Sequence, residues 1–403
     1  DASEIEDHKI TVVGPEVDEM EEGSKNSIAY IVKVAGKNMQ PDFEPVIERK
    51  FHNYINCIEG VYHTGQRDMQ RIRISIDAFN AGFRIKHIGE VLYASVKNEF
   101  DAVVIVTPHT SHVEIGKAAA RAGKHILSDK PAGISTKEVK ELLEETEKAG
   151  VSYGMIFNVR MNPVFQKAKE MLDAGCLGTL HRALWICNTW YRTPAYHHSA
   201  PWRSTWKGEC GGLLINQSQH YLDIWQWLLG MPDSVLAVLD YGKYNDFQVD
   251  DGADIQFYHK NGLHGTFISA SGENPGVNRL EIWGTKGRLC IEDTSRLILD
   301  ENVMDIQEFA RVNQEIYGKL EHRQREISVE KEEATGYQMV FKNFSDHLRK
   351  GTPLMAAGED GLRAIAMTNG AYLSSWLDKR VDFPIDDGLY ARLLEEKRKT
   401  DGK

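Results

Sequence analysis

The stretch DAVVIVTPHTSHVEI, residues 101–115, carries the strongest fold signal in this chain of 403 residues. Residues 101–108 form an apolar, β-rich run of the kind found in central parallel strands, which are buried on both faces. The run ends at Pro108, and a helix is expected to begin near Ser111 and His112. In a doubly wound sheet, such a turn lies at the carboxyl edge, where ligands bind. The free N–H groups of the helix start suit a diphosphate; an ordinary proline turn is the alternative.

Strands and helices alternate on both sides of this stretch. The apolar runs at 28–36 and 55–65 are predicted to be strands, and residues 68–94 to be mostly helical. A further helix is expected at 135–150, with a capping arrangement at its start and a glycine at its end. This alternation predicts a Rossmann-like, doubly wound parallel sheet.

From about residue 156 the pattern changes to strands joined by turn pairs such as Asn261-Gly262 and Lys286-Gly287. Such pairs are typical of hairpins, so a large, open, mainly antiparallel sheet is expected. The predicted class is therefore α/β: an N-terminal Rossmann-like sheet followed by an α+β domain. The predicted boundaries are an N-terminal extension at 1–27, the Rossmann-like domain at 28–155 and the α+β domain at 156–403.

The composition argues against several classes of protein. Hydrophobic residues make up 41% and charged residues 27% of the chain, as in a globular protein with a core. The net charge of −11 disfavours a nucleic-acid surface, and no apolar run approaches the roughly 20 residues of a membrane helix. The first residues, DASEIEDHK, are too polar for a signal peptide. The five cysteines are scattered without a C-x-x-C pair, which argues against disulfides and zinc and indicates a reducing cytoplasm.

The motif SDKPAG, residues 128–133, places Lys130 directly after a short predicted strand, at the same sheet edge as Pro108. A lysine there can hold a substrate hydroxyl, and a nearby cationic ring can lower its pKa toward the range of proton transfer. The alternative is that Lys130 is an ordinary surface lysine in a loop. That alternative is preferred unless a second catalytic residue is found.

The candidate partner is the stretch GGLLINQSQHYLDIWQWLLG, residues 211–230. Asn216, His220 and Asp223 are spaced to share one face of a helix. His220 can act as base or acid near neutral pH, Asp223 can orient it, and Asn216 can bond a substrate hydroxyl. A helix with a satisfied polar histidine is one alternative. A metal site is another, but no third ligand stands out.

An aromatic loop, YRTPAYHHSAPWRSTWKGE at 191–209, precedes the glycine pair. It combines the side chains of Tyr191, Tyr196, His197, His198, Trp202, Arg203 and Trp206. Aromatic planes with polar tips suit a sugar ring, which has an apolar C–H face and a rim of hydroxyls. A contact surface in a dimer is the alternative.

Four motifs occur in the order and spacing of a known family: TPHTSH (107–112), SDKPAG (128–133), FNVRMNP (157–163) and GGLLINQSQHYLD (211–223). From about residue 100 onward, the chain resembles the Gfo/Idh/MocA family (glucose–fructose oxidoreductase, inositol dehydrogenase, rhizopine catabolism). This resemblance implies a Rossmann domain that binds NAD or NADP. It also implies an open-sheet domain that binds a sugar or cyclitol and mediates oligomerisation.

The resemblance also implies roles for individual residues. Lys130 and His220 would handle the proton of the reacting hydroxyl while the nicotinamide accepts a hydride, and Asn216 would be a third catalytic position. The expected cofactor contacts are Gly36, Asn38, Met39, Thr64, Thr107, Pro108, His109, His112, Asp129, Lys130 and Asn158. The expected substrate contacts are Tyr191, His197, His198, Trp202, Arg203, Asn216 and Asp223.

The chain departs from the family pattern at three places. Asp129 stands where the family has Glu, and Asn216 stands where it has Asp. The G-x-G-x-x-G turn is missing, because only Gly36 of VAGKNMQ (34–40) remains. The usual acidic ribose reader is replaced by HTGQR (63–67), whose arginine makes NADP an alternative to NAD.

We therefore predict a cytoplasmic NAD- or NADP-dependent oxidoreductase that acts on a secondary alcohol of a sugar, glycoside or cyclitol. A homodimer or homotetramer is expected, without a metal, nucleic-acid or membrane partner. Two alternatives remain. One is a glycoside-cleaving enzyme of the same family that recycles its nicotinamide. The other is a non-catalytic relative that has lost the cofactor.

Overall fold

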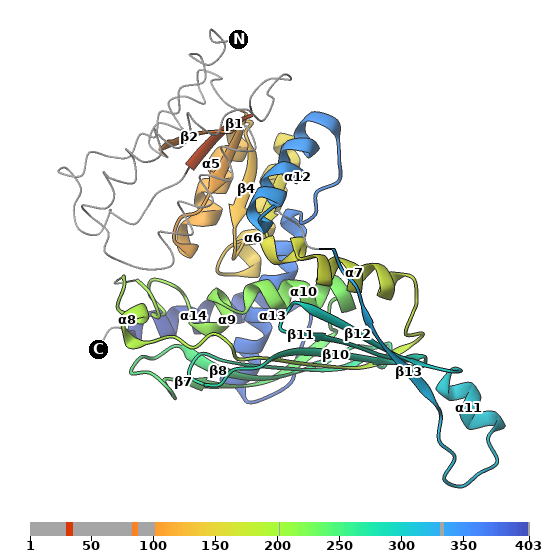
Figure 1. Ribbon diagram of the computed structural model, residues 1–403. Coiled ribbons are helices and arrows are strands. Elements are labelled where there is room, and N and C mark those ends of the chain that lie inside the picture. Colours follow the sequence, from red (N-terminus) through yellow and green to blue (C-terminus); the bar gives the residue numbers. More distant parts are fainter. Residues whose placement is uncertain (1–29, 35–82, 88–100, 201, 331–333, 402–403) are drawn as a thin grey trace. The chain divides into compact units, whose positions relative to one another are not determined.

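The computed structural model describes residues 30–34, 83–87, 101–200, 202–330 and 334–401. The chain is of the α/β class and divides into two compact units (Figure 1). Unit 1 comprises Asp1–Asn158 and Ala334–Leu362, and unit 2 comprises Val159–Glu333 and Arg363–Lys403. A segment late in the sequence, which includes helix α12 (Gly336–Lys350), therefore belongs to the first unit.

Unit 1 is built on a five-stranded sheet in the order β2-β1-β3-β4-β5. Its strands are β1 (Tyr30–Val34), β2 (Phe83–His87), β3 (Ala102–Ile105), β4 (His125–Asp129) and β5 (Tyr153–Ile156). The pairs β3–β4 and β4–β5 are parallel, as predicted. All four residues of β3 are fully buried, which explains its unbroken apolar sequence.

Two helices connect the parallel strands: α5 (His112–Arg121) and α6 (Thr136–Ala149). The predicted capping of α6 is confirmed, because the Ser135 hydroxyl accepts from the Glu138 N–H and the Glu138 side chain accepts from the Ser135 N–H. The helix ends at Gly150, whose φ of 65° is left-handed.

The first two strands run against the parallel direction. β1 is antiparallel to both β2 and β3, with Val32 opposite Ala102. Val34 therefore lies at the edge where β3 begins, and not at the edge where β3 leads into Thr107. The prediction of helix across 68–94 is wrong at β2. Its sequence FRIKH alternates apolar and basic residues with a period of two, and pairing with β1 makes it a strand.

Unit 2 is built on a nine-stranded sheet in the order β13-β12-β11-β10-β6-β9-β8-β7-β14. Its strands are β6 (Leu180–Cys187), β7 (Ser234–Tyr241), β8 (Asp250–Tyr258), β9 (His264–Ala270), β10 (Asn278–Gly284), β11 (Gly287–Glu292), β12 (Arg296–Asn302), β13 (His322–Ile327) and β14 (Val381–Asp382). The pair β6–β9 is parallel and the other neighbouring pairs are antiparallel, as predicted.

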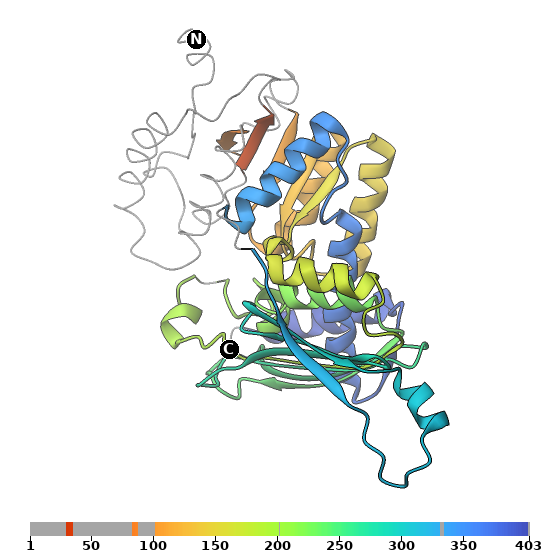
Figure 2. The ribbon, with the colours of Figure 1, turned by 45° about the vertical axis from the view of Figure 1, so that its right-hand side comes forward.

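Helices cover one face of this sheet (Figure 2). They are α7 (Pro163–Asp173), α9 (Leu213–Asn216), α10 (Gln219–Leu229), α13 (Gly358–Leu377) and α14 (Asp387–Thr400), while α8 (Pro194–His197) and α11 (Ile306–Val312) are peripheral. Side chains alternate between the faces, so Ala183, Trp185 and Cys187 of β6 are buried under the helices. Among the described helices, none is long and apolar enough to span a membrane.

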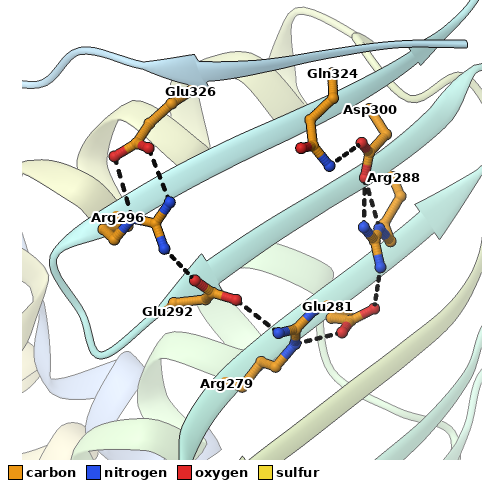
Figure 3. Close-up of polar contacts among 8 residues, drawn as sticks. All are labelled: Arg279, Glu281, Arg288, Glu292, Arg296, Asp300, Gln324 and Glu326. Atoms are coloured by element: carbon orange, nitrogen blue, oxygen red, sulfur yellow. Dashed lines mark hydrogen bonds and ion pairs between the residues drawn. The ribbon is translucent and has the colours of Figure 1, made fainter.

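The opposite face of the large sheet carries a ladder of charged side chains on β10 to β13 (Figure 3). Arg288 Nε and Nη2 donate to Asp300 Oδ2 at 2.8 and 2.6 Å, and Arg288 Nη1 donates to Glu281 at 2.9 Å. Further along, Arg296 links Glu292 and Glu326. These pairs join neighbouring strands across the solvent face of the sheet.

Candidate functional site

The carboxyl edge of β3 leads into the predicted Thr107-Pro108 turn. Thr107 is buried, and Ser111 Oγ donates to the Thr107 hydroxyl at 2.7 Å. The residues His109–Ser111 form a short 3-10 turn, and α5 begins at His112. The strand-to-helix turn predicted at this place is therefore present, and it is held by its own side chains.

His112 connects this turn to the lysine-proline motif. Its Nε2 lies 2.6 Å from Thr107 O and its Nδ1 lies 2.7 Å from Pro131 O. Both carbonyl oxygens can only accept hydrogen bonds, so an imidazolium satisfies both and a neutral ring satisfies one. The ring is 1% exposed. His112 therefore links two loops, and its expected contact with the cofactor stays a prediction.

Lys130 follows β4, and its backbone N–H donates to Asp129 Oδ1 at 2.9 Å. Asn158 follows β5 at the start of a 3-10 turn. Its buried Oδ1 has no hydrogen-bond partner among the residues that the structure describes. A buried acceptor of this kind fits the donor of a bound ligand, such as the carboxamide of a nicotinamide. Thr107, Lys130 and Asn158 thus follow three adjacent parallel strands and share one edge of the sheet.

The four remaining expected cofactor contacts, Gly36, Asn38, Met39 and Thr64, lie outside the described residues. The chain leaves β1 at Val34, at the edge of the sheet opposite to Thr107. A glycine turn that binds a diphosphate belongs at the carboxyl edge of the parallel strands. The described residues at the carboxyl edge suit the nicotinamide end of a dinucleotide, and the expected turn at Gly36 stays a prediction.

In unit 2, the glycine-led segment forms two helices instead of the one that was predicted. Asn216 ends α9, and His220 lies in the first turn of α10. The fully buried Asp250 anchors the segment, because its carboxylate accepts from Gly212 N (2.8 Å), Leu214 N (2.7 Å) and Tyr372 Oη (2.6 Å). Burial raises the pKa of Asp250, and these bonds oppose the rise.

The close approach of Asp250 also explains one of the two glycines in the motif. A Cβ atom on Gly212 would lie 2.2 Å from the backbone oxygen of Asp250, a distance that no side chain tolerates. The tight turn that begins the helix pair therefore requires glycine at this position.

Asp223 has a different place from the one expected. Its side chain is fully buried, and its oxygens accept from Arg160 Nε and Nη2 at 2.7 and 2.6 Å. Gln226 Nε2 donates to it at 3.0 Å. These bonds hold the Asp223 carboxylate within the core of unit 2, and its expected contact with substrate stays a prediction.

The aromatic loop divides into packed and exposed side chains. The Arg203 guanidinium lies 4.4 Å from the Tyr196 ring centre and 4.9 Å from that of Trp202, and it donates to Tyr196 Oη at 2.7 Å. His197 is largely buried beside Ser204 Oγ at 2.6 Å. Burial, with Arg203 as the next contributor, lowers the pKa of His197 to about 4.

The other expected substrate contacts of this loop are more accessible. Tyr191 and His198 are exposed and Trp202 is half-buried. Arg203 and His197 therefore stabilise the loop from within, and Tyr191, His198 and Trp202 are the members that a ligand in solution can reach.

Sequence reasoning missed Glu209. This residue is 1% exposed; its Oε1 accepts from Asn216 Nδ2 at 2.5 Å and its Oε2 accepts from Ser204 N at 2.7 Å. The signal available in the sequence was an acidic residue two positions before the glycine pair, in a chain whose Asn216 lacks the charge of the family motif. Spacing alone could not show that the loop folds back onto α9.

Comparisons with known proteins find two separate similarities. Residues 1–114 match a family described as CO dehydrogenase/acetyl-CoA synthase complex beta subunit, and residues 165–290 match the GFO/IDH/MocA C-terminal domain. The carbon monoxide dehydrogenase/acetyl-CoA synthase subunit alpha of Moorella thermoacetica is 50% identical over 102 residues, which are 25% of this chain and 14% of that protein. The chain spans only a seventh to a third of such relatives.

The second similarity covers about two thirds or more of the chain. Myo-inositol 2-dehydrogenase of Thermotoga maritima is 27% identical over 278 residues, which are 66% of this chain and 75% of that protein. The WlbA dehydrogenase of Bordetella pertussis, solved with NADH and UDP-GlcNAcA, has a TM-score of 0.60 at 22% identity, and the match covers 74% of this chain and 83% of that one. Levoglucosan dehydrogenase, solved with NADH and levoglucosan, has a TM-score of 0.59 at 20% identity, with coverages of 72% and 82%.

The first family match ends at residue 114, and the second begins at residue 165. The acetyl-CoA synthase match covers the predicted extension and the first part of the predicted Rossmann-like domain, and sequence reasoning did not anticipate it. The other match contains the site residues of unit 2. Residues 165–290 are similar to the C-terminal domain of GFO/IDH/MocA proteins, and a longer part of the chain is similar to an inositol dehydrogenase.

Proposed function

We propose that this chain is a nicotinamide-dependent oxidoreductase that acts on a secondary alcohol of a sugar, glycoside or cyclitol. One observation carries the proposal: the Thr107-Pro108 turn, Lys130 and Asn158 follow three adjacent parallel strands and so lie at one edge of the sheet. The carboxyl edge of a parallel sheet is where such folds bind nucleotides. The inositol dehydrogenase of T. maritima and the NADH-bound neighbours support the same assignment.

In this proposal, each residue has the role that its side-chain chemistry permits. Bound NAD, or NADP, supplies a hydride acceptor. Asn158 holds the nicotinamide end through its acceptor oxygen, Lys130 holds the reacting hydroxyl, and His220 takes the hydroxyl proton. Asn216 bonds the substrate beside His220, and the exposed residues of the aromatic loop contact the sugar ring.

The experiment is a turnover assay of the purified chain with NAD or NADP and a panel of polyols and glycosides that includes myo-inositol. Accumulation of NADH or NADPH, and its loss in H220A and K130M, is the expected result. Cleavage of a glycoside without accumulation of reduced nicotinamide would instead indicate the redox-recycling reaction. Full activity in H220A would contradict the role of His220.

A second candidate is a non-catalytic relative that keeps a polyol site and does not bind the dinucleotide. The specific observation in its favour is the antiparallel β1 in a segment that matches a different family. Calorimetric titration of NAD and NADP separates the two candidates. Binding at micromolar strength supports the enzyme, while binding of myo-inositol without either nucleotide supports the non-catalytic relative.

We also propose that the chain forms a homodimer or homotetramer through the solvent face of the large sheet. That face carries no helix within the described part of unit 2, and it exposes Leu236 and Val238 of β7. Light scattering of the purified chain tests this proposal. A monomer at micromolar concentration would contradict it.

A further inference from the structure

A buried carboxylate faces the amide of Asn216. Glu209 is 1% exposed and uses both oxygens: Oε1 accepts from Asn216 Nδ2 and Oε2 accepts from Ser204 N. A carboxylate only accepts hydrogen bonds, so the amide must turn its NH₂ group toward Glu209. The carbonyl oxygen of Asn216 is thereby directed away from Glu209.

The loop is shaped to hold Glu209 in this position. Ser204 and Cys210, which bracket it, have left-handed φ angles of 54° and 62° although neither is glycine. Such conformations persist only where the surrounding structure enforces them, and they concentrate at functional sites. Trp206, between them, is buried and donates from Nε1 to Gln248 O at 2.9 Å.

Glu209 is not simply half of an ion pair. The nearest guanidinium nitrogen of Arg203 lies 4.0 Å from Glu209 Oε1, outside hydrogen-bond distance. Arg203 donates instead to Tyr196 Oη at 2.7 Å and to Ser199 Oγ at 3.1 Å. The bonds that Glu209 accepts from an amide and a backbone N–H are both much shorter than its contact with Arg203, so these two donors fix the position of the carboxylate.

We infer that Glu209 is a positioning residue that fixes the Asn216 amide, so that Asn216 presents its carbonyl oxygen as the acceptor for a substrate hydroxyl. This inference rests on the proposed function, in which Asn216 contacts substrate. A hydroxyl that donates its hydrogen to Asn216 has its orientation set, and the charge of Glu209 strengthens the donor side of the same amide. The buried acid of the loop therefore acts on substrate through the uncharged Asn216.

The first test is Glu209→Gln. The new side chain has one acceptor oxygen, whereas both Ser204 N and Asn216 Nδ2 donate to Glu209. The backbone N–H of Ser204 cannot turn, so the introduced glutamine keeps its oxygen there and presents its NH₂ group to Asn216. Asn216 must then rotate its amide, and its NH₂ group faces the substrate hydroxyl with the wrong polarity. We expect kcat/KM to fall about tenfold to a hundredfold, the scale of one misplaced polar contact.

The decisive control is the exchanged pair E209Q/N216D. The introduced glutamine then accepts from Ser204 N and donates to the introduced aspartate, so both of these contacts again join a donor to an acceptor. The aspartate offers its other oxygen to substrate, so we expect the exchanged pair to regain part of the kcat/KM that E209Q loses. N216D alone places two carboxylates against each other and should be impaired. Equal impairment of E209Q and the exchanged pair, with both folded, would overturn the inference.

A readout independent of turnover uses the side-chain amide protons of Asn216, identified in nitrogen-15 NMR spectra by their loss in N216D. A strong bond to a carboxylate shifts one of them, and E209Q should remove this shift. An unchanged resonance overturns the inference even if the chain is an active dehydrogenase. If the chain oxidises no alcohol, the proposed function fails. Calorimetry with myo-inositol then tests the inference. If E209Q binds myo-inositol more weakly than the unchanged chain and the exchanged pair regains binding, the inference is supported. Equal binding by E209Q and the unchanged chain contradicts it.

Discussion

Arg160–Asp223 and Arg288–Asp300 are ion pairs of the same residue types with nearly the same bond lengths. In the first, two nitrogens of Arg160 lie 2.7 and 2.6 Å from the Asp223 oxygens; in the second, the two distances to Asp300 are 2.8 and 2.6 Å. They differ in burial. The first pair has side-chain exposures of 2% and 0%, and the second of 28% and 9%.

This difference decides what each pair does. On the solvent face of the sheet, water reaches the Arg288 side chain, which is 28% exposed, so we expect the pair to add less to stability than the buried one. In the core of unit 2, a partner left alone keeps a charge where water cannot reach it. Arg160 and Asp223 therefore tie the segment after β5 to α10, and the surface ladder only joins strands that the backbone already pairs.

The largest expected effect comes from breaking the buried pair. Arg160→Met leaves the buried carboxylate of Asp223 without its guanidinium, and we expect the free energy of unfolding to fall by about 3–5 kcal/mol. Urea unfolding followed by tryptophan fluorescence measures it. The matched control R160M/D223L removes both charges and should recover most of the loss. A loss below about 1 kcal/mol in R160M would contradict the claim that the buried pair matters more for stability than the surface pair.

Asp250, which anchors the glycine-led turn, is a buried carboxylate held by uncharged donors, and it extends the comparison of the two ion pairs. Asp250→Asn leaves one acceptor oxygen for the three donors from Gly212, Leu214 and Tyr372. We expect a loss of about 1–3 kcal/mol in the free energy of unfolding. The control Tyr372→Phe removes one donor and leaves the turn bonded, so it should cost less. If the two variants lose the same stability, the bonds to the turn are not what Asp250 contributes.

A pH experiment examines burial of a titratable group without an ion pair. Burial lowers the pKa of His197 to about 4. As the pH falls, the unfolded chain therefore binds a proton near pH 6.5, whereas the folded chain binds it only near pH 4. Its contribution to stability is therefore complete above pH 6.5 and is lost as the pH falls toward 4. We expect a slope of up to about 1.4 kcal/mol for each pH unit in this window. His197→Gln should flatten the profile, and an identical profile in this variant would exclude His197 as its source.

The smallest effect is expected for the surface counterpart. Arg288→Met is the same substitution as Arg160→Met, at a contact of similar length in which two Arg288 nitrogens share Asp300 Oδ2, and it should cost less than about 1 kcal/mol. Added salt at about 0.5 M should shrink the difference further, because exposed charges are screened. A loss comparable to that of Arg160→Met would show that the ladder in Figure 3 stabilises the sheet cooperatively.

Local patterns in the sequence were sufficient for the elements that carry their own signal. The apolar run at 101–108, the cap at Ser135 and the stop at Gly150 each depend on a few neighbouring residues, and each is found as predicted. The hairpin turns also predicted a mainly antiparallel second sheet. The direction of β1 could not be obtained this way, because a strand has the same alternation in both directions and only its pairing fixes which way it runs.

The sequence by itself determined the motifs: the order of Thr107, Lys130, Asn158 and His220, and the family that this order indicates. Only the tertiary structure decided the partners. Asp223 pairs with Arg160, Asp250 holds the glycine turn, and Glu209 reaches Asn216 from a loop. The reason is physical. A helix or strand is specified by contacts a few residues apart, whereas a buried carboxylate takes whichever donors the packed chain brings to it.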